Sequence, residues 1–136
     1  MDKALNYLAL GRKGSLVELG EEPVGAAARA GKAYLIVVAS DAGDHSWRRA
    51  KSYAAGTQQQ CIRVKFTKDE LGFAIGRTSL AMAAFTDAAL ALAFAKSLEG
   101  VQPEVLRSLD DKARRIKNRQ KEAKAHQRNV RMGKKK

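Results

Sequence analysis

The sequence predicts an α/β fold in which a sheet lies between layers of helices, followed by a basic tail. Patterns typical of helices and of strands alternate along residues 1–100 of the 136. The almost unbroken apolar run over residues 33–40 has the length of a strand whose two faces are both covered. From residue 101 onward the composition becomes strongly basic. Alternating helices and strands of this kind pack as a three-layer α-β-α sandwich.

Helical patterns stand on either side of the first extended segment. Apolar residues three and four positions apart predict a first helix over residues 4–13, which Gly11 and Gly14 terminate. Glu21 and Glu22 are expected in the first turn of the next helix, and Pro23 suits a position near its start, where the missing N–H costs nothing. Gly31 is typical of the residue that follows a helix end. We therefore expect a second short helix that leads directly into the buried strand.

The later helices are marked by their capping residues. Asp44 or Ser46 is expected to cap a third helix. Thr67, with Glu70 three residues later, forms the pattern of a capping box. The helices predicted from these signals cover residues 46–56 and 67–76.

The strands are short and apolar. After the last of them, Thr86 or Asp87 is expected to open a final apolar helix that extends to residue 100. The strands predicted besides the buried run cover residues 15–19, 59–66 and 81–85.

The basic tail differs from the rest of the chain in its lack of an apolar stripe. Residues 101–111, which include Pro103, are expected to form a hinge. Beyond them the chain is rich in helix formers, but Ile116 is isolated among charged residues. Such a segment buries too little surface to offset its ordering entropy. We expect a domain over 1–100 and a partly helical or disordered extension over 101–136, ordered on a charged partner.

No pattern in the sequence predicts catalysis. His45 and His126 are the only histidines, and neither has a second ligand at metal-binding spacing. Cys61, the single cysteine, lies among apolar residues and is expected to be a strand residue rather than a nucleophile. The glycines of residues 71–76 lack the rest of a phosphate-binding loop. We expect no enzyme activity, no cofactor and no metal.

The charge is concentrated in the tail. The formal net charge is +12, and the residues from 101 onward hold thirteen of the 26 Lys and Arg but four of the 14 Asp and Glu. Such cations neutralise phosphates and release counterions, which gives strong, salt-dependent binding with little sequence information. An acidic protein is an alternative partner, and the lack of an apolar face argues against a membrane. The candidate RNA-binding residues of the tail are Lys112, Arg114, Arg115, Lys117, Arg119, Lys121, Lys124, Arg128 and Arg131.

A second, smaller group of candidates lies in the loops of the domain. If the sheet brings these loop ends to one rim, they form a second RNA-binding surface, because a helix start binds phosphate through its free N–H groups. Carboxylates there would instead accept hydrogen bonds from base amino groups. The same glutamates also fit a purely structural role at a helix start. The candidates are Arg12, Lys13, Gly20, Glu21, Glu22, Arg77, Thr78 and Ser79.

Several of these segments together resemble a known family. They are Gly20-Glu21-Glu22 before a helix, the strand that leads to residues 39–42, and the glycines of residues 71–76. In order and spacing they are similar to the ribosomal L-seven-Ae/L-thirty-e family, in particular its small bacterial YlxQ-like members. The resemblance covers roughly residues 5–97.

The resemblance implies a three-layer α-β-α sandwich with a mixed four-stranded sheet. It also implies RNA binding, typically of kink-turns, through the start of the second helix and the loop before the last strand. Gly20 fits the family pattern. Pro23 stands where the family has an acid or amide, and Ala26 where it has a lysine. We therefore expect a standard kink-turn to bind little better than an unkinked duplex.

The combined expectation is a non-enzymatic RNA-binding protein associated with ribosomes or translation. Ribosome or translation-factor contacts would then accompany the RNA contacts. The alternative is a protein–protein adaptor of the same fold whose basic tail meets an acidic partner. No signal peptide or membrane-spanning run is visible, so a cytoplasmic location is expected. Trp47 is expected to pack on the sheet, with stacking on a base as the alternative.

Overall fold

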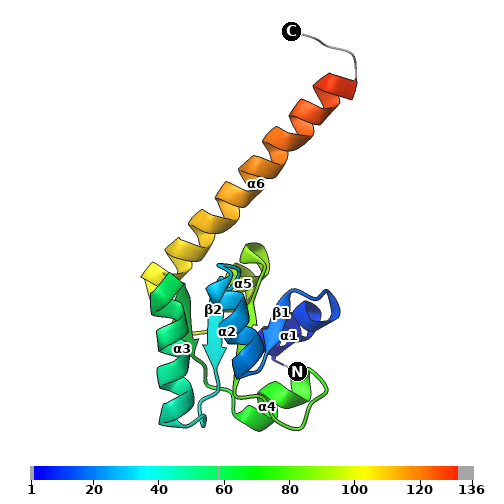
Figure 1. Cartoon of the computed structure of the whole chain (residues 1–136). Helices are drawn as coiled ribbons and strands as arrows, with labels where there is room; N and C mark the ends of the chain where they lie inside the picture. The colour runs from blue at the N-terminus through cyan, green and yellow to red at the C-terminus, as the bar shows by residue number, and fades with distance from the viewer. Residues whose placement is uncertain (1, 58, 132–136) are drawn as a thin grey trace.

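The computed structural model describes residues 2–57 and 59–131, with side chains described except at 57 and 126–131. Helices and strands alternate along the body in the order that the sequence predicts (Figure 1). The helices are α1 (Lys3–Lys13), α2 (Glu21–Arg29), α3 (Asp44–Thr57), α4 (Lys68–Ala74), α5 (Ala88–Lys96) and α6 (Pro103–Arg131). The strands are β1 (Val17–Leu19), β2 (Leu35–Val38), β3 (Gln60–Arg63) and β4 (Met82–Phe85).

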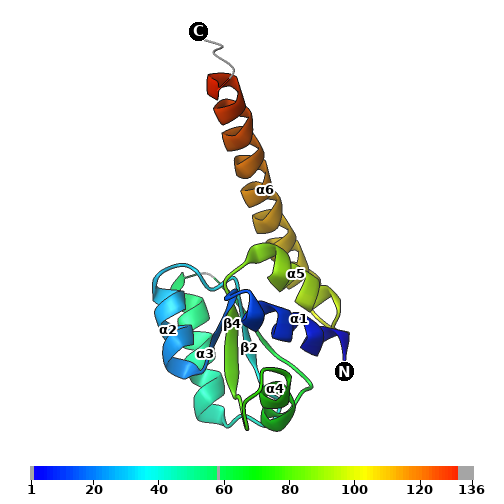
Figure 2. The same cartoon turned by 90° about the vertical axis from the view of Figure 1, so that its right-hand side faces the viewer.

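The four strands form one mixed sheet in the order β1-β4-β2-β3. Strand β4 pairs antiparallel with both β1 and β2, whereas β2 and β3 are parallel. Helices α2 and α3 cover one face of the sheet, and α1, α4 and α5 cover the other (Figure 2). The three-layer sandwich and its mixed four-stranded sheet are confirmed.

The core lies on both faces of the central strands β2 and β4. Every residue of these two strands is buried, which explains why residues 33–40 form an almost continuous apolar run. The rings of Phe85 and Phe94 pack at a centroid distance of 4.7 Å between the sheet and α5. Among the described residues, no polar or charged residue is buried. The body is therefore held together by apolar packing.

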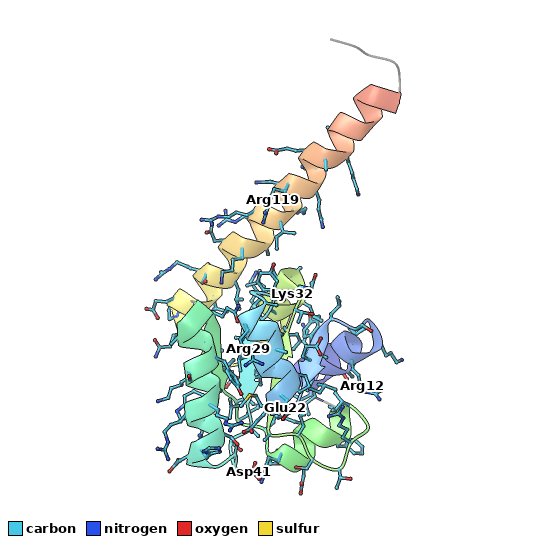
Figure 3. All side chains as sticks on the ribbon, in the orientation of Figure 1. Arg12, Glu22, Arg29, Lys32, Asp41 and Arg119 are labelled. Atoms are coloured by element: carbon cyan, nitrogen blue, oxygen red, sulfur yellow. The ribbon has the colours of Figure 1, made fainter. Side chains whose placement is uncertain are left out.

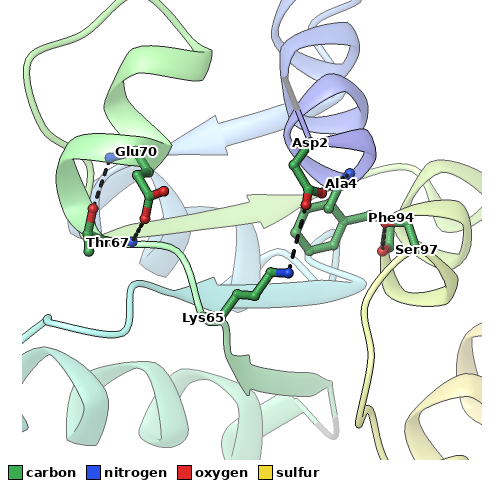
Figure 4. Close-up of polar contacts among 7 residues, drawn as sticks. All are labelled: Asp2, Ala4, Lys65, Thr67, Glu70, Phe94 and Ser97. Carbon is green, nitrogen blue, oxygen red and sulfur yellow. Dashed lines mark hydrogen bonds and ion pairs between the residues drawn. The ribbon is translucent and has the colours of Figure 1, made fainter.

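The predicted helix ends after α2 and at the start of α4 and α5 are confirmed. Gly31 follows α2 at φ +72°, and its N–H and that of Lys32 donate to the last carbonyls of the helix. Thr67 and Glu70 form the reciprocal hydrogen bonds of a capping box (Figure 4). Asp87 caps α5 by accepting a hydrogen bond from the Leu90 N–H at 2.9 Å.

The first residues of the chain fix α1 to the body. The Asp2 carboxylate accepts a hydrogen bond from the Ala4 N–H at 2.8 Å and caps the helix. The other Asp2 oxygen lies 3.8 Å from Lys65 Nζ (Figure 4). The sequence predicts that Gly11 and Gly14 terminate α1. Gly14 does cap the end of the helix, but Gly11 does not terminate it. Gly11 is buried within the helix. A Cβ at this position would lie 2.6 Å from Val17 Cγ1, so the close packing leaves no space for a side chain.

Glu21 and Glu22 lie in the first turn of α2, as predicted, and Pro23 is the third residue of the helix, a position whose N–H also lacks a partner within the helix. Two further details of the sequence prediction are wrong. Neither Asp44 nor Ser46 caps α3, because the helix already begins at Asp44. His45 is therefore an exposed residue of the first helical turn rather than of a loop. Strand β3 is four residues long instead of the predicted eight.

The hinge predicted over residues 101–111 is also wrong, because α6 begins at Pro103 and is continuous to Arg131. Its first turns pack against α5. Leu109 is fully buried in the core, and Val105 and Leu106 pack against the same cluster. The Gln60 amide donates to Ser108 Oγ at 3.3 Å. Beyond this anchored base, α6 projects away from the body (Figure 1). Its 29 residues extend about 43 Å.

Candidate nucleic-acid interface

The start of α2 is joined to α3 through Glu21. One Glu21 carboxylate oxygen accepts a hydrogen bond from Ser46 Oγ at 2.9 Å, and the other lies 3.4 Å from Arg49 Nη1. The Glu21 side chain is 29% exposed, so this carboxylate is partly withdrawn from solvent. Its acceptor atoms are thus used within the body. Glu21 fits the structural role of a helix-start carboxylate better than that of a base-reading residue.

Gly20 and Glu22 lie on either side of this contact. Gly20 has φ +98°, a conformation that favours glycine, and its N–H donates to the Met82 carbonyl at 2.9 Å. Glu22 is exposed, and Figure 3 shows it at the start of α2. Glu22 has no partner among the described side chains. The start of α2 therefore presents one unpaired negative charge to solvent.

The loop with Arg77, Thr78 and Ser79 lies at the same end of the sheet as Gly20. All three residues are exposed, and the loop leads into β4, whose first residue accepts the hydrogen bond from Gly20. The loop passes close to α4 at Gly72, where a Cβ would lie 2.7 Å from the Ser79 nitrogen. The start of α2 and the loop of residues 77–79, two of the three groups of candidate residues in the body, thus lie at the same end of the sheet.

Arg12 and Lys13 are separated from those two groups by the length of β1. They end α1, and the strand that follows begins with Val17, which pairs with Phe85 at the far end of β4. Both basic side chains are exposed. Arg12 and Lys13 thus precede the start of β1, whereas Gly20 follows its end.

The cations of α6 are exposed along most of its length. Two of them form ion pairs within the helix: Arg114 with Asp110 at 2.8 Å and Arg115 with Asp111 at 2.7 Å. Both arginine side chains remain 71% exposed, and such surface pairs contribute little stability. No ion-pair partner is present among the described side chains for Lys112, Lys117, Arg119, Lys121 and Lys124. The side chains of Arg128 and Arg131 lie outside the described ones.

These cations form two rows on roughly opposite faces of α6. At about 100° of rotation per residue, Lys112, Arg115 and Arg119 share one face. Residues 117, 121 and 124 share the other. The first row, here called the inner row, faces the turn between α2 and β2. The second, called the outer row, begins with Lys117, which lines a separate cavity of about 430 Å³ against the start of α5.

The inner row lines a cavity of about 220 Å³ between α6 and the body. Lys32, labelled in Figure 3, follows α2 in the same turn but is not one of the lining residues. The body side of this cavity carries no sequence signal, because nothing in a single sequence places the tail over this turn. The lining residues are Gly31, Ala33, Tyr34, Gln59, Lys112, Arg115, Ile116 and Arg119.

A larger cavity of about 950 Å³ lies between the start of α1 and α4. Phe73, which is 76% exposed, lines it together with the carboxylates of Asp2, Asp69 and Glu70. Lys65 is the one cation of its lining. The excess of negative charge makes this cavity unsuitable for a phosphate chain, despite its size.

Trp47 and Cys61 are held within the body. Trp47 packs partly against the core, as expected, and its ring also contacts the Arg63 guanidinium, at 5.0 Å, and Lys51 Nζ, at 5.5 Å. Cys61 is a partly buried residue of β3, and burial raises the pKa of its thiol to about 12. A thiol with so high a pKa is protonated at neutral pH and is a poor nucleophile. Among the described residues, no cluster of His, Cys, Asp and Glu suits a metal ion.

Comparisons with known proteins support the fold. No protein-family model matches the sequence, and no curated protein matches it. A solved protein of unknown function from Bacillus halodurans C is 27% identical, with a TM-score of 0.67, over 71% of this chain and 97% of its own. The 15.5 kD RNA-binding protein of Giardia lamblia is 20% identical, with a TM-score of 0.57, over 68% of this chain and 79% of its own. No described helix is both long and apolar enough to span a bilayer. The chain thus shares its fold with an RNA-binding protein, and part of the chain lies beyond that fold.

Proposed function

We propose that this chain is a non-enzymatic, cytoplasmic RNA-binding protein associated with ribosomes or translation, and a member of the ribosomal L-seven-Ae/L-thirty-e family. The observation that carries the proposal is a helix with many unpaired cations that projects from a body of nearly balanced charge. Phosphates are the partner that such an array suits, because each contact releases counterions. The Giardia lamblia neighbour, described as RNA-binding, supports the choice of RNA.

In this proposal the body positions α6, and α6 binds the RNA. The body holds the base of α6 in a fixed position through Leu109 and the contacts with α5. The cations of α6 then bind the phosphate backbone, while the exposed loop Arg77–Ser79 adds a smaller contact. Structured RNA is recognised largely through shape and backbone, which suits this division.

The test is a comparison of two polyanions near physiological ionic strength. The full chain is offered a fluorescent structured RNA and an acidic polypeptide of matched charge. Tight RNA binding with a steep salt dependence is expected. If the acidic polypeptide is captured readily and RNA is ignored, the adaptor function replaces the proposed one.

A second test concerns the type of RNA. Because Pro23 and Ala26 replace the polar residues of the family pattern and Glu21 is engaged by Ser46 and Arg49, a kink-turn should bind within about threefold of an unkinked duplex of equal length. A preference of tenfold or more for the kink-turn would show that the start of α2 reads RNA after all.

A further inference from the structure

We propose that the cavity between the inner row of α6 and the turn after α2 binds one unpaired nucleotide of the RNA, with its phosphate on the cations and its base against Tyr34. This proposal rests on the proposed function and assigns to it a site. The site lies away from the start of α2, at the turn between α2 and β2.

The charges around the cavity suit a phosphate. Lys112, Arg115 and Arg119 line it from α6. Two carboxylates share this face of α6: Asp111, which is already paired with Arg115 in an exposed contact, and Glu122, three residues after Arg119. A phosphate could therefore replace Asp111 at little cost in free energy.

The body side of the cavity suits a base. Tyr34 is half-buried, lines the cavity and is fixed through its backbone N–H, which donates to the Phe85 carbonyl at 2.8 Å. Bases of single-stranded RNA stack on such aromatic rings with little regard to sequence. Because stacking requires an unpaired base, the proposal predicts a preference for single-stranded or bulged RNA.

Gln59 supplies a second observation that points to a ligand. Its Oε1 atom is buried and accepts no hydrogen bond in the described structure. A buried acceptor without a partner is destabilising, so a donor is expected to satisfy it. Gln59 lines the cavity, and an exocyclic amino group of a base or a ribose 2′-hydroxyl is a donor of suitable size.

The test compares two triple variants of the full chain with the same change in charge. Lys112→Gln, Arg115→Gln and Arg119→Gln remove the inner row. Lys117→Gln, Lys121→Gln and Lys124→Gln remove three cations of the opposite face. The probe is a fluorescent single-stranded RNA of mixed sequence, and binding is measured from about 50 to 300 mM salt.

Loss of the inner row should lower the affinity at least tenfold more than loss of the outer row. It should also reduce the slope of log affinity against log salt by about 0.7, since the site neutralises one phosphate of a single strand. Equal losses in the two variants would overturn the nucleotide site but leave RNA binding by α6 in place. If the unmodified chain does not bind the probe, the proposed function itself fails.

A second pair of variants tests the base contact. Tyr34→Ala removes the stacking surface and should weaken binding of single-stranded RNA about tenfold, whereas Tyr34→Phe retains the ring and should bind as the parent does. Circular dichroism establishes that both variants are folded. Equal affinities of folded Tyr34→Ala and Tyr34→Phe would show that no base stacks there, and would overturn this part of the proposal.

Discussion

The start of α2 and the projecting part of α6 both carry charged residues that the sequence offers as RNA contacts, but the two regions use them differently. At the start of α2, Glu21 is engaged by Ser46 and Arg49 and joins two helices of the body. Along α6, Lys112, Arg119 and the outer row have no ion-pair partners among the described side chains. The difference shows that the partners of a charged residue, more than its type, decide whether it is free to bind a ligand.

The base of α6 and the part that projects from the body also differ in what they contribute: the base to stability, the projecting part to RNA binding. The body contains the apolar core, and α6 contributes Leu109 to it as a fully buried residue. From residue 117 to residue 125, every described side chain of α6 is exposed. A residue near the base of α6 should therefore change the free energy of unfolding, and one farther along should change RNA affinity alone.

Leu109→Ala is expected to have the largest effect on stability. Removal of a fully buried leucine side chain leaves a cavity, and the free energy of unfolding should fall by about 2–5 kcal/mol. Urea denaturation followed by circular dichroism measures it. Ile116→Ala, at a partly exposed position, serves as the control and should cost about 1 kcal/mol or less. Equal small losses would mean that the base of α6 is not part of the core.

Gly72→Ala tests the loop that lies beside the start of α2. A Cβ at this position would lie 2.7 Å from the Ser79 nitrogen, so the loop backbone must move. The free energy of unfolding should fall by about 1–3 kcal/mol. Gly56→Ala is the matched control, since Gly56 also lies within a helix and its added Cβ would meet nothing within 4 Å outside that helix. An unchanged stability of the Gly72 variant would contradict the close approach of α4 and the loop.

Glu21→Gln should have the smallest effect. It removes the ion pair with Arg49, which is partly exposed, and should lower the free energy of unfolding by about 0.2–1 kcal/mol. RNA affinity should change less than about twofold, as it should in the control Glu22→Gln. A selective loss of RNA affinity in the Glu21 variant would make the start of α2 a binding site and remove the contrast with α6.

Much of the body can be predicted from the sequence because its local signals agree with its packing. The capping residues Thr67, Glu70 and Asp87 mark helix starts that the structure retains, and Gly31 marks an end. Gly11 is the exception. The sequence pattern predicts a helix terminator there, but tertiary packing requires the glycine, since β1 and α5 leave no space for a side chain.

The candidate site was harder to predict because it depends on long-range placement. The cations of α6 are visible in the composition, but which part of the body each row faces depends on how Leu109 holds the helix against the core. Pro103 was interpreted as part of a hinge although proline also suits the first turn of a helix. Tyr34 and Gln59 carry no sequence signal, because what distinguishes them is the helix that lies above them.

The most direct test of the central claim is the salt dependence of RNA binding by the full chain and by a chain that ends at residue 116. This truncation retains Leu109 and removes the cations from Lys117 onward. If α6 binds the phosphates, the truncated chain should bind at least about a hundredfold more weakly near 0.1 M salt, with a clearly shallower slope. An equal affinity and an equal slope for the two chains would contradict the account.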